Sequence, residues 1–217
     1  SWRQVPGSNR RDPAARLMGK LNITLIVVVL AVLAWSAINP SDWPTWALEA
    51  GPVIVGLPLL LLTGRQFPLT QLLYFLLAVH AVILVIGAHY TYAHVPVGFW
   101  VQDMFDLSRN HYDRLGHLAQ GFVPAILARE ILLRTSPLRP GKWLFTLVLS
   151  VCLAFSAFYE LLEWWAALIM GEGADEFLGT QGDPWDTQAD MFLAMTGAIL
   201  AQLSLSRLHD KQLARLP

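Results

Sequence analysis

The sequence predicts an all-α membrane protein, a polytopic bundle of six transmembrane helices with both ends of the chain on the cytoplasmic side. Hydrophobic residues make up 55% of its 217 residues and charged residues only 14%, with a mean hydropathy of +0.46. Soluble domains carry about a quarter charged residues, so this composition is typical of membrane proteins. Nine tryptophans, several of them at the ends of apolar runs, suit the two interfaces of a bilayer.

Six segments approach the length of about 20 mostly apolar residues that a spanning helix needs. We expect these helices at residues 21–38, 46–62, 69–90, 113–133, 143–170 and 186–205. The first is followed by "NPSDWP" rather than by a small-residue cleavage site, so we expect it to be retained. The chain then divides into a cytoplasmic basic segment (1–20), a six-helix transmembrane domain (21–207) and a cytoplasmic tail (208–217).

The fourth segment, residues 113–133, is the least apolar of the six. Its polar residues are Asp113, His117, Gln120, Arg129 and Glu130. Because a charged side chain facing lipid costs several kcal/mol, we expect its polar face to point into the bundle. The sequence alone does not decide whether this helix spans the membrane fully.

The basic residues predict the orientation of the chain in the membrane. They gather in the N-terminal segment, in the second and fourth links, and in the tail (Arg3, Arg10, Arg11, Arg16 and Lys20; Arg65; Arg134, Arg139 and Lys142; Arg207, Lys211 and Arg215). The other three links are acidic or nearly neutral. Since basic residues favour the cytoplasmic side, these four regions are expected inside the cell and the remaining links outside it.

The remaining composition excludes several classes of site. The net charge of −1 gives no basic field for nucleic acid, so we expect membrane lipids and no nucleic acid as partners. The single cysteine, Cys152, cannot form an intrachain disulfide or a cysteine zinc cluster. The sequence also has no nucleotide-binding loop, no serine nucleophile elbow and no c-type haem attachment motif.

Ionisable residues recur near the predicted outer ends of three helices. Asp113 and His117 are four residues apart on the fourth helix, and Asp186 and Asp190 have the same spacing on the sixth. The fifth helix carries Glu160 and Glu163, three residues apart, within "FYELLEWW". Residues three or four apart share a helix face, so each pair is expected to point in one direction, toward a common outer pocket.

This pattern predicts a divalent-metal site with oxygen and nitrogen ligands, which suits Zn, Mn, Fe or Mg. We expect the ligands to be Asp113, His117, Asp190 and His89, and the acid–base residues to be Glu160, Glu163 and Asp186. Asp183 or Asp186 would cap the sixth helix, and His111 would be an additional ligand or base. The predicted function is a metal-dependent hydrolase or lipid-modifying enzyme that acts at the outer face on a lipid or lipid-linked group.

Two other classes of function fit the same residues. They could line the path of a small transporter, or they could form a hydrogen-bonded network, with Arg109 and Arg114 as counter-charges, in a non-catalytic subunit of a membrane complex. Neither the substrate nor the oligomeric state follows from the sequence.

Other side chains are expected to meet the two membrane surfaces. Trp100, Trp164, Trp165 and Trp185 fit an outer aromatic belt. Toward the inner surface, we expect Arg129, Glu130 and Arg134 to reach out to the interface. His209, in the tail, is expected to be solvated.

Three motifs, "HYDRLGHLAQGF", "FYELLEWW" and "FLGTQGDPWDTQADM", resemble those of the YjdF-like family of bacterial inner-membrane proteins, a domain of unknown function. The likeness extends from the first predicted helix to the sixth. It implies a multi-pass protein of the bacterial inner (cytoplasmic) membrane and supplies no reaction. The last helix is also similar, more loosely, to the VanZ-like pattern, in which an asparagine often stands where this chain has Asp190.

Overall fold

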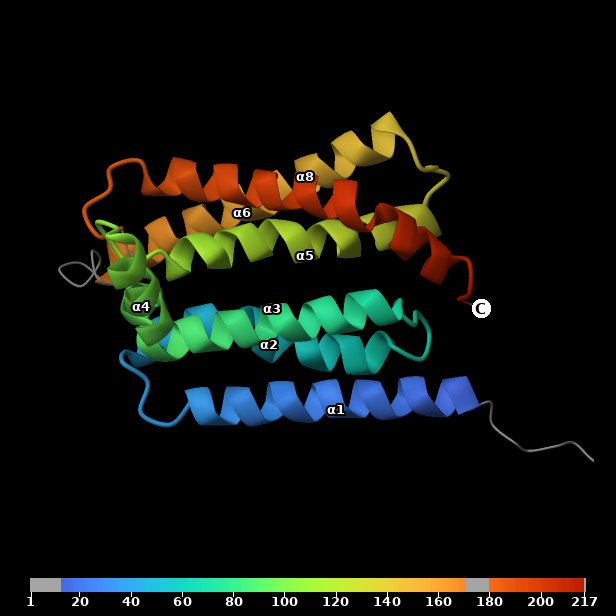
Figure 1. Ribbon diagram of the computed structural model, residues 1–217, viewed down its shortest axis with the longest axis horizontal. Coiled ribbons are helices and arrows are strands. Elements are labelled where there is room, and N and C mark those ends of the chain that lie inside the picture. The colour runs from blue at the N-terminus through green and yellow to red at the C-terminus, as the bar shows by residue number, and fades with distance from the viewer. Residues whose placement is uncertain (1–12, 171–179, 217) are drawn as a thin grey trace, which may run out of the picture.

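The computed structural model describes residues 13–170 and 180–216, and every regular element within these ranges is a helix (Figure 1). The elements are α1 (Pro13–Ser36), α2 (Trp43–Thr63), α3 (Gln71–Tyr90), the short 3₁₀ helix η1 (Tyr92–His94), α4 (Pro96–Phe105), α5 (Tyr112–Thr135), α6 (Lys142–Met170) and α8 (Asp186–Leu213). The six long helices lie close to the expected segments. The sequence did not predict α4 or η1, which fall in a predicted link.

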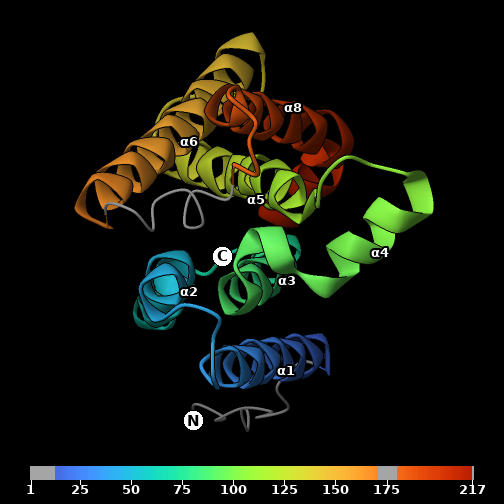
Figure 2. The ribbon, with the colours of Figure 1, turned by 90° about the vertical axis from the view of Figure 1, so that its left-hand side faces the viewer.

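The long helices lie side by side in two groups, with α1, α2 and α3 on one side and α5, α6 and α8 on the other (Figure 2). Contacts between α3 and α5 join the two groups, and the most extensive helix pair is α5 with α8. Both α5 and α8 start at the end of the bundle where α4 lies (Figure 1). Their first turns therefore meet at that end.

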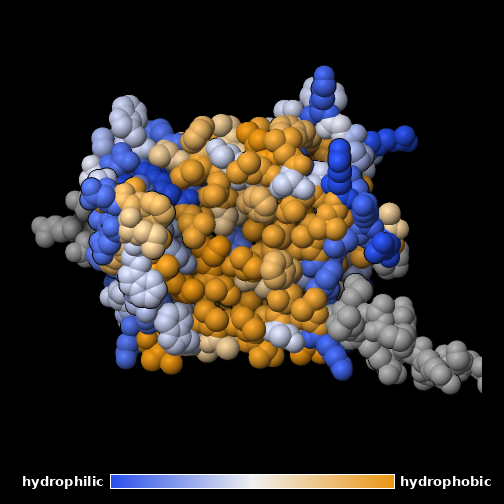
Figure 3. Space-filling model, in the orientation of Figure 1, coloured by the Kyte–Doolittle hydropathy of each residue, from blue (hydrophilic) through white to orange (hydrophobic). Residues whose placement is uncertain are grey.

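The surface carries a broad apolar band between two hydrophilic ends (Figure 3). Many large apolar side chains are largely exposed, for example Leu62 and Ile169. Five helices, α1, α2, α3, α6 and α8, are long and apolar enough to cross a bilayer. The expected all-α polytopic membrane architecture is thus confirmed.

Helix α5, with 24 residues, is long enough to cross a bilayer, but its polar residues are spread along its length, so it is not among those five. It contacts α3, α6 and α8, and these neighbours cover its polar face. Asp113, His117, Arg129 and Glu130 are all buried. The prediction that this face avoids lipid is therefore confirmed.

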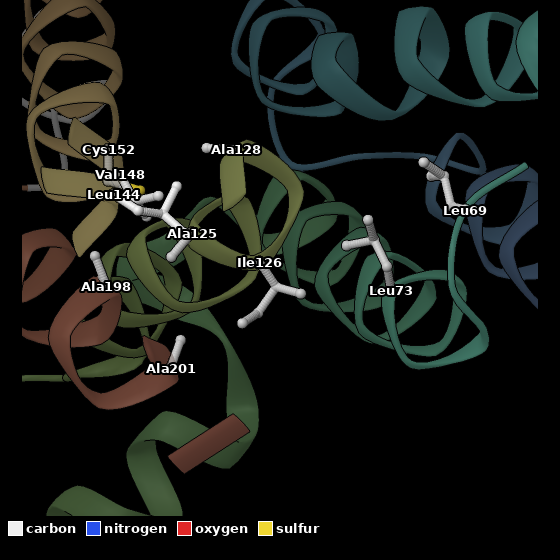
Figure 4. Close-up of a cluster of buried hydrophobic side chains, with 10 residues drawn as sticks. All are labelled: Leu69, Leu73, Ala125, Ile126, Ala128, Leu144, Val148, Cys152, Ala198 and Ala201. Carbon is white, nitrogen blue, oxygen red and sulfur yellow. The ribbon is translucent and has the colours of Figure 1, made fainter. Parts of the chain in front are cut away.

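Close packing of α5 on α8 depends on two glycines. A Cβ added to Gly121 would collide with the backbone oxygen of Ala194, and one added to Gly197 would collide with that of Leu118. Small residues let helix backbones approach in this way. Toward the end opposite α4 the same helices, with α3 and α6, enclose an apolar cluster (Figure 4), which comprises Leu69, Leu73, Ala125, Ile126, Ala128, Leu144, Val148, Cys152, Ala198 and Ala201.

A buried charge network closes the end of the bundle at which α3 and α6 begin. Glu130 and His209 are both 0% exposed, and His209 Nε2 lies 2.9 Å from Glu130 Oε2. Arg129 donates to His209 Nδ1 at 2.9 Å and pairs with Asp210 at 2.8 Å. Because arginine has no acceptor, His209 Nδ1 must accept and its proton sits on Nε2, facing Glu130. Arg134 also contacts the Glu130 carboxylate, at 3.0 Å.

This network also satisfies the free backbone donors at the start of α3. Glu130 accepts from the backbone N–H of Thr70 at 3.1 Å and from its hydroxyl at 2.8 Å. Gln212 accepts from the backbone N–H of Leu72 at 2.8 Å. Side chains of α5 and α8 thereby cap a helix that is far from them in the sequence.

Two expectations about this end were wrong. His209 is fully buried rather than solvated, and Arg129 and Glu130 are buried in the network rather than reaching out to the interface. The reason is that α8 continues to Leu213, eight residues beyond the predicted end, so His209 lies on a helix packed against α5. The sequence does not reveal that charged residues on two helices far apart in the chain are partners of one another.

Replacing Gly121 by alanine is expected to destabilise the protein by about 1–3 kcal/mol, because the new methyl group forces α5 and α8 apart. The free energy of unfolding in mixed micelles measures this. Gly56→Ala is the matched control, since a Cβ there meets nothing within 4 Å and alanine is the better helix former. Equal stability of the two variants would contradict the close packing described.

Candidate metal centre

Five buried ionisable residues gather at the end of the bundle where α5 and α8 begin. Asp113 and His117 come from the first turns of α5, Asp186 and Asp190 from the first turns of α8, and Glu160 from α6. All five are at most 9% exposed. As expected, these three helices bring their ionisable side chains together in one buried cluster.

Asp113, His117 and Asp190 form the tightest group. His117 Nε2 lies 3.4 Å from Asp113 Oδ1 and 3.8 Å from Asp190 Oδ2, and the three residues offer donor atoms within 4.8 Å of one another. These separations are longer than good hydrogen bonds. The 3.4 Å separation matches the edge of a tetrahedron with bonds of 2.0–2.2 Å, which is about 3.3–3.6 Å, and the 3.8 Å separation is slightly longer.

The other side of the His117 ring faces a fourth acid. His117 Nδ1 lies 3.9 Å from Glu160 Oε1, and neither atom has a hydrogen-bond partner among the described residues. Histidines that bind metals usually direct their second ring nitrogen at a carboxylate, which fixes the tautomer. His117 has this arrangement, with Nε2 toward two aspartates and Nδ1 toward a glutamate.

Two arginines neutralise part of the negative charge. Arg114 contacts Asp183 at 2.9 Å and Asp186 at 2.7 Å, and it also pairs with Asp190. Arg109 pairs with Asp186 at 2.9 Å. The predicted role of Arg109 and Arg114 as counter-charges is confirmed. Asp190 therefore bridges the arginine network, through Oδ1, and His117, through Oδ2.

The loop before α5 and the turn before α8 are held together over this cluster. Asn110, fully buried, donates its backbone N–H to Gln181 Oε1 at 3.1 Å, and Gln181 Nε2 donates to the Asn110 carbonyl at 2.9 Å. Arg109 donates to the carbonyl of Thr180 at 2.9 Å. These bonds fix the two helix starts relative to each other, and hence the relative positions of Asp113 and Asp190.

Glu49 on α2 is a member of the cluster that sequence reasoning missed. It is buried, and its carboxyl group lies within the electrostatic reach of Asp113, His117 and Glu160 and beside the Tyr92 hydroxyl. Burial raises the pKa of Tyr92 well above its ordinary value, and the neighbouring Glu49 adds to the shift. A lone acid within a predicted spanning helix was the available signal, because such residues are rare there.

Glycine positions make room for Tyr92. A Cβ at Gly87 on α3 or at Gly116 on α5 would collide with the Tyr92 ring. The ring therefore sits between the two helix groups and directs its hydroxyl toward Glu49. In the sequence these two glycines are indistinguishable from ordinary packing glycines.

The remaining predicted site residues lie around this group. Glu163, half-buried, lines a small cavity of about 40 Å³ with Leu48, Glu49, Tyr159 and Leu162. His89 is outside the cluster, because its ring packs on Trp35 and its Nδ1 lies 3.0 Å from the Ser36 carbonyl.

His111 precedes α5, and partial burial, together with Arg109 and Arg114, lowers its pKa. Asp183 and Asp186 do not cap α8 in the expected way. Asp183 accepts from the Trp185 N–H, which precedes the helix, and Asp186 binds the arginines. The roles predicted for His89, His111, Glu163 and Asp186 stay predictions.

Comparisons with known proteins support the resemblance found in the motifs. A family described as "Predicted membrane protein (DUF2238)" matches residues 21–211, which include the whole cluster. "Inner membrane protein YjdF" of Escherichia coli (strain K12) is 54% identical over 195 residues, covering 90% of this chain and 93% of that protein. No solved structure matches the chain.

Replacing Arg114 by glutamine is expected to destabilise the protein by about 3 kcal/mol, because Asp186 and Asp190 would keep buried charges without their main partner. Arg114→Lys should lose less stability, since lysine keeps the positive charge but not the forked hydrogen-bonding geometry of arginine. Unfolding in mixed micelles compares both with Arg139→Gln, a change at an exposed position. Wild-type stability of Arg114→Gln would show that the ion pairs do not hold α5 and α8 together.

Proposed function

The chain belongs to the DUF2238 family of predicted membrane proteins and is a multi-pass protein of the inner membrane; from this premise we propose that it is a metal-dependent enzyme whose outer cluster holds a divalent cation. Asp113, His117 and Asp190 are the proposed ligands. The proposed reaction is hydrolysis of a lipid or lipid-linked group in the outer leaflet.

The proposal includes a sixth span and a fixed orientation. Helix α5 has 24 residues, about 36 Å at the α-helical rise, and its neighbours shield its charges. Arg65 and Arg139 lie in the two links at the end opposite α4, and Lys142 begins α6 at the same end (Figure 1). The positive-inside rule then places this end in the cytoplasm, and the metal site near the periplasmic face.

The observation that carries the proposal is the setting of His117. Its two ring nitrogens face carboxylates on both sides, at 3.4–3.9 Å, which is longer than a good hydrogen bond and suited to a cation on the Nε2 side. A network that served packing alone would bring these buried groups into direct hydrogen bonds, as the inner network does between His209 and Glu130 at 2.9 Å.

Charge supports the same conclusion. The carboxyl groups of Glu49, Asp113, Glu160 and Glu163 have no lysine or arginine within ion-pair distance in the part of the chain that the structure describes. Both arginines at this end bind other aspartates. Buried carboxylates repel one another unless protons or a cation compensate them.

Each residue then has a defined task. A cation held by the two aspartates and His117 would act as a Lewis acid on a phosphoryl or carbonyl oxygen. Glu160 would orient the His117 ring, Asp186 would hold Arg109 and Arg114, and Glu163 would transfer protons. The small cavity beside Glu163 lies between two apolar helices, and the exposed Leu48 and Leu162 line it. This favours an amphiphilic substrate that approaches from the bilayer.

The direct test is metal binding by protein stripped with a chelator and reloaded with Zn²⁺ or Mn²⁺. We expect one tightly bound equivalent for the wild type. Glu160→Gln should weaken binding about 10–100-fold, as loss of a ligand's carboxylate partner does, and His117→Gln should weaken it further. Asp103→Asn, at an exposed position on α4, is the matched control and should bind like the wild type.

Loaded protein in liposomes made from a total lipid extract provides the functional readout. Mass spectrometry should detect release of a headgroup by the wild type and not by His117→Gln. The proposal of a metal-dependent enzyme would be refuted if the correctly folded wild type binds no metal, or if His117→Gln binds metal as tightly as the wild type. The cluster would then be a packing network.

A further inference from the structure

Helix α4 departs from the direction of every other helix. It runs across the axes of the long helices at their outer end and extends sideways beyond the bundle (Figures 1 and 2). Its ten residues lie between η1 and the loop that leads into α5. Within α4 only Gly98 is buried, so most of its surface faces outward.

One face of α4 is continuously apolar. Val97, Trp100, Val101 and Met104 have the i, i+3, i+4, i+7 spacing that places residues on one helix face, and they are 44%, 68%, 41% and 75% exposed. Asp103 is also exposed, and at 100° per residue it lies to one side of this face. The helix is therefore amphipathic and has no protein against its apolar side in the described chain.

The opposite side of α4 is fixed to the bundle. Asn110, fully buried, donates from Nδ2 to the Val95 carbonyl at 3.0 Å and accepts from the Tyr112 N–H at 3.0 Å. A Cβ at Gly98 would collide with the Asn110 side chain, so only glycine allows this contact. The apolar face thus points outward in a set direction and cannot turn inward.

We propose that α4 lies in the outer interface of the bilayer, with the face formed by Val97, Trp100, Val101 and Met104 buried among lipid headgroups and the first acyl carbons. The apolar band of the spanning helices borders the more hydrophilic end at which α4 lies (Figure 3), so α4 is at the edge of the lipid-facing surface. Tryptophan favours this depth, and a short helix with one apolar face binds in the plane of an interface.

The position of α4 in the lipid interface would affect the proposed metal centre, although the proposal for α4 does not require a bound metal. Asn110 joins α4 to the start of α5, and its neighbour Arg109 pairs with Asp186. Lipid contact on α4 would therefore hold the loop that covers the carboxylate cluster. The proposed partner is the lipid surface itself.

Two single-cysteine variants, with the cysteine at adjacent positions of α4, test how the helix is oriented in the membrane interface. Met104→Cys and Asp103→Cys, each in a Cys152→Ala background, are labelled with an environment-sensitive fluorophore and reconstituted in liposomes. We expect the label at 104 to be quenched by nitroxide groups near the lipid carbonyls and to be at least threefold less sensitive to aqueous iodide than the label at 103, as an interfacial helix requires. Val97→Cys should behave like Met104→Cys.

Two results would overturn the proposal. Equal iodide quenching at 103 and 104 would place both sides of α4 in water. Protection of 104 from both iodide and the lipid quencher would mean that protein covers the face, for example a second copy of the chain. Wild-type unfolding temperatures for both labelled variants confirm that the readout comes from folded protein.

Discussion

The structure depends on one constraint, that the charged side chains of α5 must find partners inside an apolar bundle. This helix carries several ionisable residues near each end and an apolar stretch between them, and it packs against three other long helices. Removing such groups from water costs several kcal/mol each unless they are paired. The position of α8 against α5, the arginine network and the caps of α3 all satisfy this requirement. The packing glycines Gly121 and Gly197 let α8 approach closely enough to supply the partners.

The two ends of α5 meet this requirement in different ways, and the difference points to function. At the inner end, Glu130, His209 and Arg129 form a closed chain of short hydrogen bonds, as expected of a purely structural network. At the outer end, His117 and Glu160 keep atoms without hydrogen-bond partners among the described residues. Buried polar atoms without a protein partner need a water molecule or an ion to satisfy them. A cation at His117 would complete the outer end as Arg129 completes the inner one.

Much of the fold could be predicted from sequence because hydropathy and the length of a bilayer leave few choices. The pairs Asp113–His117 and Asp186–Asp190 were found by their spacing alone, and their meeting followed from both helices starting at the same face. Glu49 and His209 could not be placed, since each belongs to a network assembled from helices distant in sequence. Helix α4 was missed because ten residues with a glycine and a proline resemble a link, and only its tertiary contact through Asn110 fixes it.

X-ray absorption spectroscopy on Zn²⁺-loaded protein in lipid discs tests the central claim most directly. The account predicts a shell of nitrogen and oxygen atoms at about 2.0–2.2 Å with the scattering signature of a single imidazole, and loss of that signature in His117→Gln. A spectrum with no imidazole contribution, or one unchanged by His117→Gln, would contradict it, because the cation would then be held without His117.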